Sequence, residues 1–235
     1  MIKQATSEAV GTAFLLATVV GSGIMGERLA GGNVAIALLA NTIATGAGLV
    51  ALIWTFGPIS GAHFNPLVTI ADAWVGGRPW RDVPIYIVAQ TLGALLGVAI
   101  AHGMFGEPVF AASQHVRSGS AQLLSEFVAT FGLLSVIWGV SRRNPQFTPL
   151  AVGAYITAAY WFTSSTSFAN PAVTLARSLT NTFSGIRPLD VPGFIIAQCA
   201  GALTATALFK FLAPAPPIKA ALPLVKVVTV DEEIA

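Results

Sequence analysis

The chain has 235 residues, of which 54% are hydrophobic and only 9% are charged, with a mean hydropathy of +0.74. A soluble domain carries about 25% charged residues, so the composition excludes an ordinary soluble protein and predicts an integral membrane protein in contact with lipid. The net charge of +2 gives no reason to expect a nucleic-acid partner, and the single cysteine, Cys199, excludes an internal disulfide.

The first apolar run follows Lys3 and continues too far, without a cleavage site, for a signal peptide, so we interpret it as a retained membrane span. Six apolar stretches are long enough to cross a bilayer as helices. Their approximate limits are 5–26, 33–56, 82–104, 121–140, 147–164 and 190–212. The sequence after residue 212 is rich in proline and alanine. We therefore expect one membrane domain over 1–212, followed by a flexible C-terminal tail over 213–235.

Two further apolar segments, after the second and the fifth span, are only about ten residues long and too short to cross. They begin with Asn65-Pro66-Leu67 and with Asn170-Pro171-Ala172. Proline is favoured at the first position of a helix because its missing N–H is not needed there, and the preceding Asn oxygen can cap free N–H groups. Each segment is therefore predicted to be the start of a half-helix.

The two halves of the chain repeat one another. Ser7-Glu8-Ala9-Val10 matches Ser125-Glu126-Phe127-Val128, and the two Asn-Pro segments match as well. Each repeat, about 5–104 and 121–212, thus holds three spans and one half-helix. Because three is odd, the second repeat must enter the membrane from the opposite side. The predicted fold is an all-α membrane protein with six transmembrane helices and two re-entrant half-helices in an inverted three-plus-three repeat.

Basic residues near the ends of the spans predict the orientation, because they are enriched on the cytoplasmic side. One side receives Lys3, Arg78, Arg81, Arg142, Arg143, Lys210, Lys219 and Lys226. The other side receives only Arg28, Arg117, Arg177 and Arg187. We expect both termini to be cytoplasmic, with the first half-helix entering from the cytoplasm and the second from outside.

These motifs resemble the aquaporin, or major intrinsic protein, family over residues 5–212. The resemblance implies a passive channel with a narrow pore in each subunit, four identical subunits, no cofactor, and a location in a bacterial inner membrane. It also implies that the half-helices meet at the bilayer centre, so that Asn65, Pro66, Leu67, Asn170, Pro171 and Ala172 form the pore centre. Two helix N-termini facing each other would repel cations there. The alternative is that both Asn side chains are only buried caps.

The resemblance places the selectivity filter at Thr45, Ala158, Ser167 and Val173. Most relatives carry arginine at the last of these positions, usually with an aromatic partner. Four small uncharged side chains would form a wider filter, which is similar to that of bacterial aquaporins that pass arsenite and methylated metalloid hydroxides. Glycerol, water, urea and ammonia remain alternative solutes.

Two charged or titratable residues are expected in the vestibules: His63, just before the first Asn-Pro pair, and Arg177, four residues after Val173. Arg177 would lie about 6 Å further out on the same helix face. It either lines the outer vestibule, in place of the missing filter arginine, or anchors the C-terminal end of the half-helix. Its repeat partner, Asp72, should lie on the opposite side of the membrane, so no salt bridge between them is expected.

Glu8 and Glu126 are intramembrane acids, which are functional candidates by default. Their matching repeat positions, and the family resemblance, favour carboxylates that accept hydrogen bonds from the re-entrant loops over a proton relay. The three His residues have no spacing typical of a metal site, and we expect neither a metal nor an enzymatic activity. The two alternative functional classes are an ion-coupled transporter and a junction protein with a closed pore.

Overall fold

The computed structural model describes residues 1–213, and over that range it consists of helices and connecting segments, without strands. The α-helices are α1 (Ile2–Leu29), α2 (Val34–Ser60), α3 (Pro66–Trp74), α4 (Val83–Phe105), α5 (Ser120–Ser141), α6 (Thr148–Phe162), α7 (Pro171–Arg177) and α8 (Val191–Leu212). The 3-10 turns η1 (Trp80–Asp82), η2 (Pro145–Phe147) and η3 (Pro188–Asp190) lead into α4, α6 and α8. The predicted tail beyond Ala213, with Lys219 and Lys226, lies outside the described residues.

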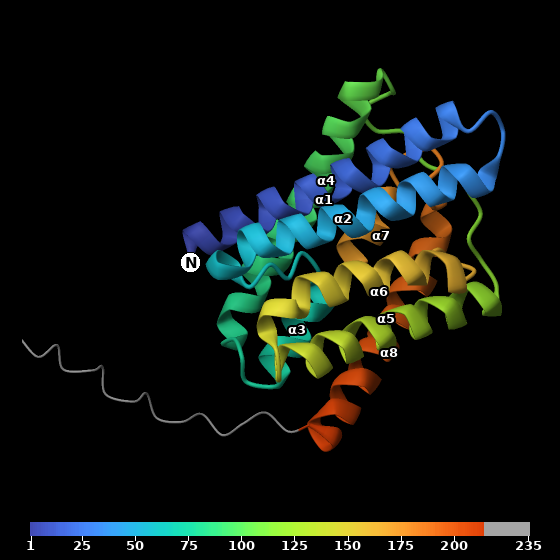
Figure 1. Cartoon of the computed structure of the whole chain (residues 1–235). Helices are drawn as coiled ribbons and strands as arrows, with labels where there is room; N and C mark the ends of the chain where they lie inside the picture. Colours follow the sequence, from blue (N-terminus) through green and yellow to red (C-terminus); the bar gives the residue numbers. More distant parts are fainter. Residues whose placement is uncertain (214–235) are drawn as a thin grey trace, which may run out of the picture.

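The all-α prediction of six long helices and two half-helices is confirmed (Figure 1). Within residues 1–213, five segments are long and apolar enough to span a membrane: Ile2–Leu29, Val34–Ser60, Trp80–Phe105, Ser120–Ser141 and Pro188–Leu212. The sixth long helix, α6, has only 15 residues. Because η2 leads directly into it, the helical rod runs over 145–162, and its length approaches that of a span.

The helices pack in the same pattern in both halves of the chain. In the first half α1 contacts α2 and α4, and in the second half α5 contacts α6 and α8. Glycines allow the closest approaches: a Cβ atom at Gly93 or Gly97 of α4 would overlap the backbone of α1, and one at Gly201 of α8 would overlap the backbone of α5. Small residues at such crossings are typical of helix packing in membranes, where close van der Waals contact drives association.

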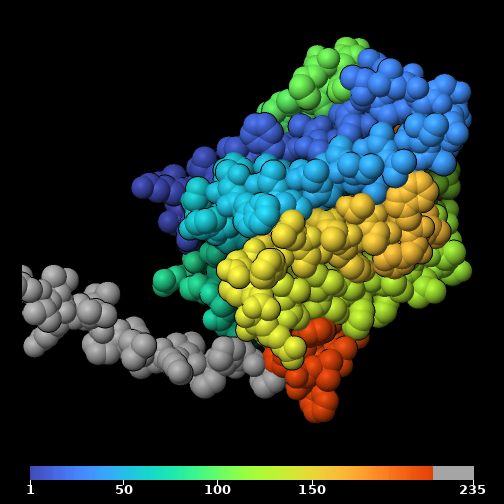
Figure 2. Space-filling model, in the orientation of Figure 1, coloured from blue at the N-terminus to red at the C-terminus, as the bar shows by residue number. Residues whose placement is uncertain are grey.

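The two halves meet where α2 lies beside α6, as the space-filling view shows (Figure 2). Gly46 and Gly153 face each other at this crossing, because a Cβ atom on either would approach the carbonyl oxygen of the other. The outward faces of both helices carry large exposed apolar side chains: Ile36, Leu39, Ile43 and Trp54 on α2, and Leu150, Trp161 and Phe162 on α6. Such a surface suits lipid tails or another apolar protein surface rather than water.

Candidate functional site

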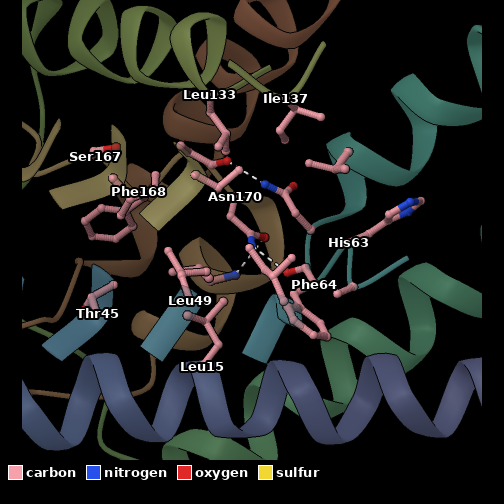
Figure 3. Close-up of a pocket in the computed structure, with 18 of the residues that line it drawn as sticks. Leu15, Thr45, Leu49, His63, Phe64, Leu133, Ile137, Ser167, Phe168 and Asn170 are labelled. Carbon is pink, nitrogen blue, oxygen red and sulfur yellow. Dashed lines mark hydrogen bonds between the residues drawn. The ribbon is translucent and has the colours of Figure 1, made fainter. Parts of the chain in front are cut away.

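A cavity of about 240 Å³ runs through the middle of the helix bundle. Residues from α1, α2, α5, α6, both half-helices and the segments before them line it, whereas α4 and α8 contribute no lining residue in the described part of the chain. Figure 3 shows Asn170 between Thr45 and Ser167 on one side and His63 on the other. We call the two ends of this cavity the Arg177 end and the His63 end.

Both half-helices begin as the sequence predicts. Asn65 caps α3 by accepting a hydrogen bond from the backbone N–H of Leu67, at 2.9 Å. Asn170 caps α7 by accepting from the N–H groups of Ala172 and Val173, at 3.0 and 3.3 Å. The prolines after the two Asn residues occupy the first turn of each helix. Each cap therefore fixes the oxygen of its Asn side chain, and leaves the amide nitrogen to point elsewhere.

The amide nitrogens connect the two repeats at the centre of the cavity. Asn65 Nδ2 donates to the carbonyl oxygen of Ala169 at 2.8 Å, and Asn170 Nδ2 donates to the carbonyl oxygen of Phe64 at 2.7 Å. An amide group has two N–H donors, so one remains on each Asn for a molecule in the cavity. Each Asn side chain therefore borders the cavity in addition to capping its half-helix.

The other motif residues lie behind this lining. Pro66, Leu67, Pro171 and Ala172 are absent from the residues that border the cavity in the described chain, although we expected all four at the pore centre. Leu67 and Ala172 belong instead to the hydrophobic core, with exposed fractions of 5% and 2%. The helical turn explains this, because the residues after an N-cap rotate away from the face that the cap presents.

The backbone before each Asn has an unusual conformation that repeats. Ala62 and Phe64 have φ angles of 49° and 48°, and Ser167 and Ala169, at the matching positions, have 51° and 49°. Left-handed φ values are costly for residues with a side chain and persist only where the surroundings enforce them. Non-helical backbone at membrane depth also needs internal hydrogen-bond partners. Both requirements are met by buried carboxylates that accept hydrogen bonds from the backbone of these segments.

The two carboxylates belong to Glu8 and Glu126, and both residues have 0% exposure. Glu8 accepts from the backbone N–H groups of His63 and Phe64, at 3.0 and 2.7 Å. Glu126 accepts from those of Phe168 and Ala169, both at 2.9 Å. Each carboxylate thus holds the two N–H groups directly before its repeat's Asn, and all of its contacts are with neutral donors rather than with a paired base.

Helices α4 and α8 reach the same carboxylates from outside the lining. Gln90 Nε2 donates to Glu8 at 2.8 Å and to Thr69 Oγ1 at 2.9 Å. Gln198 Nε2 donates to Glu126 at 2.6 Å and to Thr174 Oγ1 at 2.8 Å. The two outer helices therefore lock the re-entrant segments in place without touching the contents of the cavity. Cys199, next to Gln198, is likewise outside the lining.

The constriction expected near the Arg177 end differs from the prediction at one position. Thr45, Ser167 and Val173 are buried and border the cavity, but Ala158 is exposed on the outward face of α6. Tyr160 borders the cavity in its place, and its hydroxyl donates to Thr45 Oγ1 at 3.3 Å. Two residues along a helix differ by about 200° in direction, so Ala158 and Tyr160 face opposite sides. An aromatic side chain that the prediction omitted is therefore present.

Arg177 is buried, with 2% exposure, and borders the cavity one helical turn beyond Val173. Its Nε donates to the carbonyl oxygen of Ser184, and its guanidinium carbon lies 3.4 Å from the centroid of the Phe168 ring. Its two terminal nitrogens make no hydrogen bond to any described residue. Arg177 is therefore held by a backbone carbonyl outside α7 and stacked on Phe168, while it also borders the cavity.

Arg117 is a residue that the sequence did not single out. It lies in the segment between α4 and α5, and donates to the carbonyl oxygens of Gly185 and Ser165, at 2.7 and 3.1 Å. Its guanidinium carbon lies 5.1 Å from the Phe168 ring, so Phe168 is within reach of two guanidinium groups. Burial lowers the pKa of Arg117 from its ordinary value. No sequence motif marks this residue, because its partners are backbone carbonyls from distant segments.

His63 borders the other end of the cavity, and its Nδ1 lies 3.0 Å from Thr69 Oγ1. Asp72 and Arg78 lie close to it. The remaining histidines are elsewhere: His102 is buried at the end of α4 and contacts Thr180, and His115 lies in the segment between α4 and α5. Among the described residues, no three His, Cys, Asp or Glu side chains are grouped as a metal site would require.

Comparison with known proteins gives a consistent result. The family model for the major intrinsic proteins matches residues 1–167 and 148–231. The chain is 55% identical over 219 residues to the aquaglyceroporin AqpS of Rhizobium meliloti (strain 1021), which covers 93% of this chain and 94% of the relative. It is 34% identical over 166 residues to the glycerol uptake facilitator protein of Bacillus subtilis (strain 168), covering 63% of this chain and 58% of the relative.

A solved structure has the same fold. The aquaglyceroporin from Plasmodium falciparum superimposes with a TM-score of 0.71, covers 90% of this chain and 96% of its own, and has 20% sequence identity. At this identity the likeness concerns the arrangement of the helices alone.

Proposed function

The chain belongs to the major intrinsic protein family, and on that basis we propose that it is a passive channel whose preferred solutes are arsenite and other neutral or methylated metalloid hydroxides. The family consists of channels rather than enzymes, and its aquaglyceroporin members are passive channels for small neutral solutes such as glycerol and water. Arsenite at neutral pH is an uncharged trihydroxy molecule similar in size to glycerol. Glycerol and water are the alternative main solutes.

The observation that carries the proposal is the position of Val173. It follows the second Asn-Pro-Ala motif, borders the cavity, and puts an apolar side chain where most relatives would place arginine. The other side chains at this level, those of Thr45, Tyr160 and Ser167, are also uncharged. The hydroxyl of Tyr160 is engaged with Thr45, so the ring adds a second apolar surface. A constriction of this kind favours weakly hydrated neutral molecules over ions.

The centre of the cavity supports passage of neutral molecules and exclusion of cations. The N-termini of α3 and α7 meet there, and each carries about half a positive charge from the helix dipole. The free N–H of Asn65 and that of Asn170 can donate to one oxygen of a passing molecule. A water molecule held by two such donors cannot accept further hydrogen bonds along the file, which interrupts proton transfer.

Arg177 would act in the outer vestibule. Its terminal nitrogens have no protein partner among the described residues, and it lies one turn outside Val173. In this role it would replace part of the charge that Val173 removes from the constriction, and would donate hydrogen bonds to solute oxygens before they reach the apolar level.

The excess of basic residues beside the His63 end supports a cytoplasmic location for that end and for both termini. A homotetramer in a bacterial inner membrane fits the family and the apolar outward faces of α2 and α6. Each subunit would hold its own pore, because the cavity is lined within one chain.

The test is stopped-flow permeability of proteoliposomes to water, glycerol and arsenite, with the Val173→Arg variant measured alongside. The wild-type protein is expected to pass all three solutes, and Val173→Arg to lower arsenite and glycerol flux at least tenfold while water flux falls less. Unchanged arsenite flux in Val173→Arg would contradict the filter assignment. Flux that collapses with an uncoupler would favour an ion-coupled transporter, and an absence of any flux would favour a junction protein.

A further inference from the structure

Asp72 and Arg177 occupy equivalent positions in the two repeats. Asp72 is the seventh residue after Asn65, and Arg177 is the seventh residue after Asn170. Both side chains border the same cavity, one at each end. At equivalent positions of the inverted repeat, the His63 end therefore has the carboxylate of Asp72 and the Arg177 end has the guanidinium of Arg177. The proposed function uses the guanidinium, but gives no role to the carboxylate.

The carboxylate of Asp72 accepts no hydrogen bond from any described residue. His63 Nε2 and Arg78 Nε lie 3.7 and 4.0 Å from its Oδ2, and both distances exceed hydrogen-bond length. Arg78 is held elsewhere: it donates to the carbonyl oxygen of Ser60 at 2.8 Å, and its guanidinium carbon lies 3.9 Å from the centroid of the Tyr86 ring. Asp72 therefore borders the cavity with a carboxylate that accepts no hydrogen bond from the described residues, although the charge of Arg78 is close by.

The hydrogen bonds of Thr69 determine which nitrogen of His63 carries the proton. The hydroxyl of Thr69 donates to the carbonyl oxygen of Asn65, at 3.2 Å, and its oxygen accepts from Gln90 Nε2. With the hydroxyl proton assigned to the carbonyl oxygen of Asn65, His63 Nδ1 is the donor in its contact of 3.0 Å with Thr69 Oγ1. In the neutral ring, Nε2 is then an acceptor. This agrees with the absence of a hydrogen bond between Nε2 and Asp72.

His63 Nε2 and Asp72 Oδ2 thus lie 3.7 Å apart beside the cavity, with no hydrogen bond between them, and Arg78 Nε lies 4.0 Å from the same Asp72 oxygen, beyond hydrogen-bond length. A partly buried acceptor without a donor is unfavourable, so molecules in the cavity must supply the donors. Solutes with two adjacent hydroxyl groups can donate to both acceptors at once. The two NH₂ groups of urea can do the same, whereas a solute without O–H or N–H donors cannot.

We propose that His63 and Asp72 form a hydroxyl-accepting site at the His63 end of the pore, which binds polyols and trihydroxy metalloids and makes the two ends complementary. The Arg177 end donates hydrogen bonds to the oxygens of a solute, and the His63 end accepts hydrogen bonds from its hydroxyl groups. This site rests on the proposed function, since it assumes that hydroxylated solutes pass through the pore.

The experiment compares the permeability of proteoliposomes to water, glycerol and arsenite at low solute concentration for the wild type and Asp72→Asn. Asparagine keeps the shape of the side chain but removes the charge that strengthens its hydrogen bonds. The ratios of glycerol and of arsenite permeability to water permeability are expected to fall about tenfold, since bonds to charged acceptors are roughly twice as strong as those to neutral ones. Asp82→Asn is the matched control, because Asp82 lies near Arg81 and outside the cavity lining.

A role through Arg78 makes a different prediction. If Asp72 only balanced the charge of Arg78, the double variant D72N/R78Q would recover the wild-type ratios, whereas a solute-contacting carboxylate predicts no recovery. Recovery, unchanged ratios in Asp72→Asn, or an equal fall for water and both solutes would overturn the site while leaving the channel function intact. A wild-type protein that passes water but neither glycerol nor arsenite would overturn the proposed function, and the site with it.

Discussion

The side chains of Asn65 and Asn170 join the two repeats by hydrogen bonds that run in both directions. The side-chain oxygen of each caps its own half-helix, and the side-chain nitrogen donates to the backbone of the opposite re-entrant segment, at 2.8 and 2.7 Å. The two Asn residues therefore join the half-helices as well as border the cavity. The conformation of one half of the pore centre depends on the other half.

Asn170→Ala is expected to lower the free energy of unfolding by about 2–4 kcal/mol, because it removes a helix cap and leaves the buried carbonyl of Phe64 without a donor. Thermal unfolding of the detergent-solubilised protein measures this loss. Asn33 caps α2 at an exposed site and makes no contact with the other repeat, so Asn33→Ala should cost only about 1 kcal/mol. Equal losses for the two variants would show that the crossed hydrogen bond adds nothing.

Glu126→Gln should destabilise the fold without changing the choice of solute. The carboxylate accepts three hydrogen bonds, from two backbone N–H groups and Gln198, whereas a Gln side chain has one acceptor oxygen and an NH₂ group that would face a donor. We expect a loss of about 3 kcal/mol or a failure to accumulate folded protein. Glu107→Gln, which breaks the partly exposed pair with Arg28, should cost less than about 1 kcal/mol. A folded Glu126→Gln variant with altered glycerol-to-water ratios would contradict a purely supporting role.

Tyr160 and Ala158 offer a matched test of which face of α6 borders the pore. Tyr160→Ala removes an aromatic ring from the cavity and should raise permeability to solutes larger than glycerol several-fold, while costing about 3–5 kcal/mol of stability. Ala158→Phe adds a ring on the outward face and should leave every permeability ratio unchanged. Reconstituted vesicles and a series of polyols of increasing length provide the measurement. A block by Ala158→Phe would restore the assignment made from the sequence.

Arg177→Met keeps much of the side-chain volume and removes the guanidinium, which is stacked on Phe168 and has free terminal nitrogens. The glycerol-to-water permeability ratio is expected to fall about threefold to tenfold, since bonds from a charged donor are lost. Arg187→Met is the control, because Arg187 lies on the same side, pairs with Asp190 and does not border the cavity. If Arg177→Met leaves both the ratio and the exclusion of ions unchanged, Arg177 serves only to anchor α7.

The titration of His115 is expected to make the free energy of unfolding depend on pH. Partial desolvation, and secondarily the charge of Arg117, lower the pKa of His115, whose side chain is partly exposed, from its ordinary value of 6.5. Between the lowered pKa and 6.5 the unfolded state binds more protons, so stability increases with pH in that window. The contribution of His115 is fully present above pH 6.5 and is lost as the pH falls through the lowered value. His115→Gln should flatten this part of a plot of melting temperature against pH, and an unchanged slope would contradict the assignment.

The sequence was sufficient for the half-helices and for the fold, because these depend on local chemistry. Asn followed by Pro favours a capped helix start, as at Asn65 and Asn170, and an odd number of spans per repeat requires inversion. Glu8 and Glu126 could be linked to the re-entrant segments because they occupy matching positions in two copies of one pattern. Duplication thus supplied information that one copy would have lacked.

The error at Ala158 has a physical origin. The segment between α6 and Ser167 is not helical, so the distance along the chain from Val173 does not determine which face of α6 points inward. α6 is apolar on all sides, as a buried membrane helix is, and its pattern gives no inward face. The pairing of Asp72 with His63 could not be predicted from the sequence either. It depends on the hydrogen bonds of Thr69 in the folded chain, and no sequence motif marks it.

Because α4 and α8 lie outside the cavity lining, no thiol borders the described pore, which bears on the proposed metalloid solutes. The only cysteine of the chain, Cys199, lies on α8 and does not border the cavity. Thiolates are soft ligands that bind soft metals and metalloids tightly, and a thiol in the pore wall would hold a trivalent arsenical instead of releasing it. Among its described residues the wall contains hydroxyl, amide, imidazole, indole, carboxylate, guanidinium and hydrocarbon groups, but no thiol. On the proposed function, a cargo that reacts with thiols would therefore cross the described part of this pore without contacting one.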